Sequence, residues 1–137
     1  MRKLSKLPTY LGCILVSFMA TSFRIESTVR GHHVFKDVWT PCINEQLHVH
    51  VEEGNAFDEH AVAVWKDGQV VGHLPREIAT TCWYFLRRRN SRIVCKITGH
   101  RHLSEIRGKG LVVPCIYTFE GKQNYIQKLI SVFANKL

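Results

Sequence analysis

The chain has 137 residues, of which 45% are hydrophobic and 22% are charged. This length fits one domain, and the apolar content is enough to bury a core, which excludes a globally disordered chain. There are 19 Lys and Arg against 11 Asp and Glu, a formal charge of +8. The excess favours polyanionic partners, namely nucleic acid, an acidic protein or an anionic membrane surface, although many small proteins are basic without a specific partner.

Residues 1–24 are predicted to lie outside the domain. A basic start is followed by an apolar run from Leu11 to Ala20, a layout typical of a secretory signal peptide. The run is shorter than the roughly 20 residues that a membrane-spanning helix needs, so no stable membrane span is expected. The remainder lacks an Asn-x-Ser/Thr acceptor and a dense cysteine framework. We therefore expect an intracellular protein, nuclear or cytoplasmic, or a secreted one if this segment is a true signal.

The expected domain comprises residues 25–137, and the pattern of its first half predicts strands. Residues 46–52 alternate apolar and polar side chains, which is typical of a half-buried strand. Residues 61–65 form a second apolar run, and residues 70–74 form a third. The dipeptide Asp67-Gly68 lies between these two runs and predicts a tight hairpin, because glycine accepts positive φ.

The second half combines two helices with further strands. Pro75 precedes a helix predicted over residues 77–89 that ends in three arginines, and its inward face comprises Ile78, Cys82, Phe85 and Leu86. Residues 92–98 form a strand, 99–110 a long basic loop, and 111–119 a strand that Pro114 should place at an edge or a bulge. A closing helix over 121–137 should bury Tyr125, Leu129, Ile130 and Phe133. The sequence thus predicts a mainly β (α+β) fold, a small OB-like β-barrel with two helices.

Two linked motifs resemble the HIRAN domain family. The first is Glu53-Gly-Asn-Ala-Phe-Asp-Glu-His-Ala-Val-Ala-Val, and the second is Asp67-Gly-Gln-Val-Val-Gly-His-Leu-Pro-Arg-Glu-Ile-Ala. The resemblance extends over roughly residues 26–123 and is strongest over 53–79. It implies an OB-like barrel that binds nucleic acid, with capture of the 3′ end of single-stranded DNA as the family's function. The chain has no Gly-x-x-x-x-Gly-Lys-Ser/Thr motif, so the helicase motor that often accompanies the domain is not expected.

The resemblance also implies a set of site residues. Asp58 matches an aspartate that accepts a hydrogen bond from the terminal 3′-hydroxyl, and Phe57 matches an aromatic residue on which the terminal base stacks. The family's basic-aromatic-aromatic run is broken at Val38-Trp39-Thr40, which keeps one aromatic residue with Lys36 nearby. The expected nucleic-acid contacts are Lys36, Trp39, Asn55, Phe57, Asp58, His73, Arg76 and Arg101.

Five of these residues also have a structural explanation. Phe57 can pack in the core, His73 can be a structural histidine, and Trp39 can pack on a loop. Asn55 and Asp58 can serve the turn before the strand through their side chains. The three arginines at the helix end can simply face solvent.

Other chemistries find less support in the sequence. The five cysteines form no CxxC pair, and Cys82 and Cys95 lie in apolar stretches, as buried free thiols do. The histidine pairs, such as His48 and His50, lack third and fourth ligands at a defined spacing, so no metal, other cofactor or catalytic residue is expected. The alternative function is a protein-interaction module that uses a barrel edge bearing Pro114 and the basic 99–110 loop.

Overall fold

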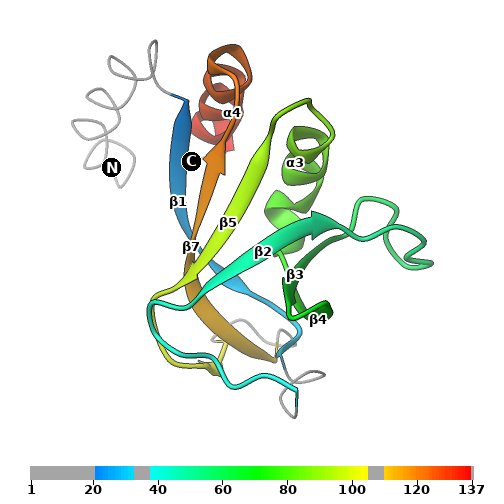
Figure 1. Ribbon diagram of the computed structural model, residues 1–137, viewed down its shortest axis with the longest axis vertical. Helices are drawn as coiled ribbons and strands as arrows, with labels where there is room; N and C mark the ends of the chain where they lie inside the picture. The colour runs from blue at the N-terminus through cyan, green and yellow to red at the C-terminus, as the bar shows by residue number, and fades with distance from the viewer. Residues whose placement is uncertain (1–20, 33–37, 105–109, 137) are drawn as a thin grey trace.

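The computed structural model describes residues 21–32, 38–104 and 110–136. Its centre is a single antiparallel sheet in the order β1-β7-β5-β2-β3-β4, with β6 paired to β7 (Figure 1). The strands are β1 (Ser22–Val29), β2 (Gln46–Val51), β3 (Val62–Lys66), β4 (Gln69–His73), β5 (Arg92–Ile97), β6 (His102–Leu103) and β7 (Leu111–Glu120). The mainly β fold expected from the alternating patterns is confirmed.

Two helices cover one side of this curved sheet (Figure 1). They are α3 (Arg76–Leu86) and α4 (Gln123–Lys136). The inward faces predicted for both helices are confirmed, although α3 ends three residues earlier than expected. Their buried residues join the inward side chains of the strands in one core, and the helical contributions include Cys82, Phe85, Ile126, Leu129, Ile130 and Phe133.

The two edge strands meet at a single β-bridge. Arg30, directly after β1, and His73, at the end of β4, exchange two backbone hydrogen bonds of 2.7 and 2.8 Å. Gly72 permits this approach, because a Cβ atom there would lie 2.4 Å from Cγ1 of Val29. The sheet therefore curls towards a barrel without a full closing ladder, which is the OB-like shape that the sequence predicts.

The prediction that Pro114 places its strand at an edge or a bulge is wrong, because β7 is internal and its registers with β1 and β5 show no shift. Strand β7 lies between β1 and β5, and Pro114 pairs with Thr28 of β1. The Pro114 carbonyl accepts a hydrogen bond from Thr98 N, just beyond the end of β5. Because the N and O atoms of one strand residue face the same neighbour, the missing N–H falls where the ladder with β5 ends. A barrel edge bearing Pro114 is therefore not available to a protein partner.

Two further boundaries differ from expectation. Strand β1 begins at Ser22 and Phe23 is buried in the core, so the sheet begins three residues before the expected start of the domain at residue 25. The expected signal-like run at 11–20 lies outside the described residues. The expected 99–110 loop contains the short strand β6 in its described part. Across the described residues, no helix has the length and apolar character to cross a membrane.

The hairpin and the cysteines match their predictions. Asp67 and Gly68 both have positive φ, 51° and 79°, as a type I′ turn between β3 and β4 requires. Cys82, Cys95 and Cys115 are buried free thiols, whereas Cys42 is exposed. A hydrogen bond with Cys115, together with burial, raises the pKa of the Cys95 thiol, which keeps it a protonated core side chain.

Candidate functional site

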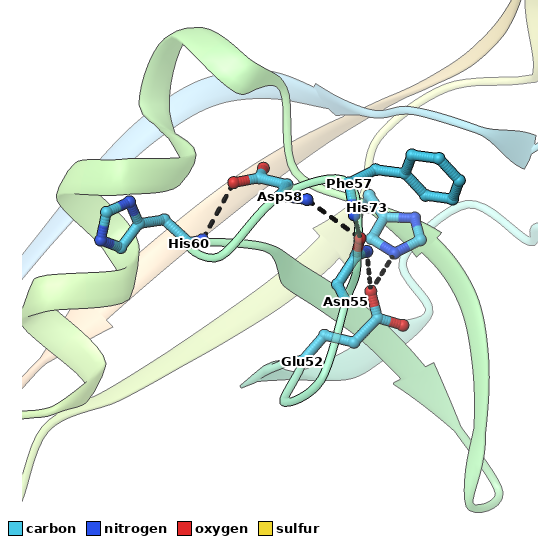
Figure 2. A network of polar contacts seen from close by, with 6 residues as sticks. All are labelled: Glu52, Asn55, Phe57, Asp58, His60 and His73. Atoms are coloured by element: carbon cyan, nitrogen blue, oxygen red, sulfur yellow. Dashed lines mark hydrogen bonds and ion pairs between the residues drawn. The ribbon is translucent and has the colours of Figure 1, made fainter.

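The connection between β2 and β3 holds the residues on which the family resemblance depends. Asn55 Oδ1 accepts hydrogen bonds from the backbone N–H groups of Phe57 and Asp58, at 2.8 and 3.1 Å. Asp58 Oδ1 accepts a third bond from His60 N at 2.9 Å (Figure 2). These side-chain contacts define the backbone path of the loop, so the turn roles considered for Asn55 and Asp58 are present.

Glu52 ties this loop to the sheet. Its Oε1 atom accepts a hydrogen bond from Asn55 Nδ2 at 2.9 Å and lies 2.8 Å from His73 Nε2 (Figure 2). Burial raises the pKa of Glu52, but the hydrogen bonds from Asn55 and His73 and the electrostatic effect of the His73 ring outweigh it and leave the pKa lowered. Glu52 is therefore an ionised anchor that joins the end of β2, the loop and the end of β4.

The Phe57 ring is presented to solvent from this braced loop. Its exposed fraction is 93%, so the alternative that it packs in the core is wrong. In Figure 2 its ring lies at the same end of the network as the His73 ring, with His60 at the other end. An aromatic ring this exposed adds little to the fold, and both of its faces are open to a flat ligand.

The far side of the loop is held against α3. The His60 ring meets the Trp83 ring edge-on at 4.7 Å and lies 5.4 Å from the Tyr84 ring. Glu53 pairs with Arg87 at 3.0 Å. The loop is thus fixed at one end by the sheet and at the other by the helix.

The predicted cations are placed unevenly. Arg76 is exposed at the start of α3, three residues after His73. Arg101 is exposed, and its Nη1 atom lies 3.1 Å from His32 Nε2. His32 follows Arg30 by two residues, so Arg101 reaches the region of the Arg30–His73 bridge. Lys36 lies outside the described residues.

The stacking role expected of Trp39 is wrong in this structure. Its side chain is 3% exposed and belongs to the core. The indole N–H donates to Glu45 Oε1 at 3.1 Å, and the ring meets His32 edge-on at 5.4 Å. A ring enclosed in this way offers no face on which a base could stack.

The sequence did not predict that Glu52 joins Asn55 to His73, or that the His60 ring packs against Trp83 and Tyr84 of α3. Glu52 continues the alternation of β2, in which His50 faces outward. Across the sheet, His50 of β2 is aligned with Ala63 of β3, and Ala63 is aligned with His73 of β4. The alternation of β2 is visible in the sequence, but the alignment of Glu52 with His73, 21 residues further on, is not. Across the described ranges, no three His, Cys, Asp or Glu side chains group as metal ligands.

Comparison with solved structures gives the fold. The crystal structure of the HIRAN domain of human HLTF matches with a TM-score of 0.64 and 22% identity, covering 85% of this chain and 92% of that one. An NMR structure of the HLTF HIRAN domain matches with a TM-score of 0.55 and 22% identity, over 85% and 91% of the two chains. A protein from Lactobacillus plantarum matches with a TM-score of 0.51 and 18% identity, over 73% and 99%.

These neighbours show that the chain has a HIRAN-like fold, as the two sequence motifs suggested. No protein-family model matches the sequence, and a search of curated proteins gives no significant match.

Proposed function

We propose that this chain is a nucleic-acid-binding module that holds the 3′ end of single-stranded DNA and has no catalytic activity of its own. The observation that carries the proposal is the Phe57 ring, which is 93% exposed on a loop braced by Asn55 and Glu52. A rigid, exposed aromatic side chain is a sequence-independent platform for a base. The HIRAN-like fold supports this assignment, because nucleic-acid binding is the function that the family resemblance implies.

The charges around Phe57 favour a strand end over an internal linkage. Asp58 follows Phe57 directly, and Glu52 and Glu53 lie on the same loop. Carboxylates repel phosphates, whereas a carboxylate accepts a hydrogen bond from a terminal hydroxyl. Asp58 would therefore address the 3′-hydroxyl with the acceptor capacity that the bond from His60 N leaves.

Cations at the margin of the site would hold the phosphates that follow the end. Arg76 and Arg101, which are both exposed, and Lys36 would neutralise these phosphates. His73 would contact the strand from the position set by its bond to Glu52. The formal charge of +8 would draw the polyanion towards the module as a whole.

The test is fluorescence anisotropy of the full chain with short single strands that carry a free or a phosphate-blocked 3′ end, over a salt series. We expect tighter binding of the free end. Phe57→Ala should cost about 1–3 kcal/mol of binding free energy, the value of one stacked base. Its free energy of unfolding should not change, because the ring is exposed. Asp58→Asn should reduce the preference for the free end.

Leu103→Ala is the matched control, because Leu103 is another exposed apolar side chain, 72% exposed, on β6. It should leave the affinity unchanged. Binding that ignores the 3′ end would reject the role of Asp58 and leave a general basic surface. No binding at low salt would reject the function and favour a protein partner.

A further inference from the structure

A groove lies between α3 and α4, away from the network around Glu52. Its volume is about 310 Å³. Its lining includes the apolar side chains Phe85 and Leu129 on the floor and four longer side chains, namely Tyr84, Arg88, Tyr125 and Lys128. Tyr84 is 55% exposed, so one wall of the groove is an open aromatic ring.

Arg88, which lines the groove, and Lys122, which does not, both lie against the Tyr125 ring. The Arg88 guanidinium carbon lies 5.2 Å from the centre of the Tyr125 ring, and Lys122 Nζ lies 5.9 Å from it. The lining contains no Asp or Glu. Among the ion pairs of the described residues, none involves Arg88, Lys122 or Lys128. The groove therefore presents positive charge that the chain itself does not neutralise.

The groove is connected to the loop of the candidate site. Tyr84 lines the groove and its ring lies 5.4 Å from the His60 ring. His60 in turn donates its backbone N–H to Asp58. A ligand that leaves the Phe57–Asp58 loop along α3 would meet the His60 and Tyr84 rings first, and then Arg88 and the Tyr125 ring.

We propose that the groove between α3 and α4 is a second contact surface for the same single strand. Bases internal to the strand would stack on Tyr84 and Tyr125, and Arg88 and Lys128 would neutralise their phosphates. Aromatic rings interleaved with cations are how single strands are held without sequence preference. This inference rests on the proposed function, because it assigns the path of a strand whose end lies at Phe57.

An acidic peptide is the competing occupant of a basic groove with an apolar floor. Two observations favour the nucleic acid, namely the open Tyr84 ring and its contact with the loop that would hold the strand end. A helical peptide seated on the floor would require neither feature.

The test compares two single strands that share a free 3′ end, one of about 4 and one of about 16 nucleotides, the range of site sizes for such barrels. The short strand occupies the end site, and only the long strand reaches the groove. Tyr125→Leu keeps an apolar side chain against the core but removes the ring. It should weaken binding of the long strand about 5- to 150-fold, the loss of one stacked base, and leave the short strand unaffected, because Tyr125 lies on α4 and the end site is built on the loop between β2 and β3. Arg88→Gln with Lys128→Gln should lower the slope of log K against log salt for the long strand by about 1.4, because each lost phosphate contact removes about 0.7.

The matched control is Arg24→Gln with Lys96→Gln. It removes the same charge from exposed cations that line a different surface cavity, so it should leave the salt slope of the long strand unchanged. If the short strand binds and the Arg88/Lys128 variant keeps the long strand's affinity and slope, the groove proposal is overturned while the proposed function stands. If neither strand binds the wild type, the proposed function itself fails. If the Arg88/Lys128 variant loses binding to an acidic, leucine-containing peptide that the wild type binds, and keeps its affinity for the long strand, the proposal is also overturned and the groove is assigned to a protein partner.

Discussion

Glu52 is the residue on which the geometry of the candidate site depends. One of its oxygen atoms receives both Asn55 and His73, so a single carboxylate sets the position of the loop relative to β4. Charge-assisted bonds of this kind are stronger than neutral ones. The exposed Phe57 ring is held by residues that are themselves only partly exposed.

The acid stability of the protein should report on Glu52. Its pKa in the folded state lies below the ordinary value of 4.5, so ionised Glu52 stabilises the fold above pH 4.5. This contribution is lost as the pH falls through the folded pKa. Urea unfolding of the wild type and Glu52→Gln across this range should show a stability difference that shrinks at acid pH.

Glu53→Gln is the control for this experiment, because it removes a nearby carboxylate whose pair with Arg87 is largely exposed. Its effect on stability should be small at every pH. A difference between wild type and Glu52→Gln that stays constant below pH 4.5 would contradict the anchoring role.

Whether two aromatic residues, Trp39 and Phe57, are buried could not be predicted from the sequence. Trp39 was expected to stack on a base and is buried, whereas Phe57, for which core packing was an alternative, is exposed. Both lie in irregular segments, where no periodicity tells the inward from the outward side. The burial of Trp39 depends on Glu45 and His32, and neither contact is encoded by a local pattern.

At the scale of elements, the strands and helices follow their local signals closely. The Asp67-Gly68 turn, the inward face of α3 and the amphipathic α4 all appear where the sequence predicts them. Each depends on residues within a few positions of one another, so the signal is complete in the local sequence. The pairing partners of β7 are different, because Pro114 excludes one hydrogen bond but does not identify the strand beside it.

The contact between the ends of β1 and β4 should depend on Gly72. A Cβ atom there would lie 2.4 Å from Val29 Cγ1, so Gly72→Ala should destabilise the fold by about 1–3 kcal/mol through overpacking. Val29→Ala removes the obstructing methyl group. The double variant should therefore be less destabilised than the sum of the two single variants, as measured by urea unfolding. Strict additivity would mean that the two sites do not meet.

At the scale of the whole molecule, the central position of β7 has a measurable consequence. On one side it pairs with β1 over residues 113–120, and on the other side it pairs with β5 and β6. Its residues Cys115, Tyr117 and Phe119 are buried. Hydrogen exchange should therefore be slowest at the amides of these residues, because their release requires global unfolding. Amides of β7 that exchange as fast as those at the outer edge of β4 would contradict the strand order.

The sequence by itself determined the class of fold, the strands β2, β3, β4, β5 and β7, both helices and the hairpin turn, and its resemblance to a family singled out Asn55, Phe57 and Asp58. These features arise from contacts between near neighbours in the chain. Only the tertiary structure decided that β7 is central, that Trp39 is buried, that Glu52 joins the loop to His73, and that Tyr84, Arg88 and Tyr125 share one groove. These depend on the alignment of strands and helices that are distant in sequence, and the free energy that sets this alignment comes from packing the whole core.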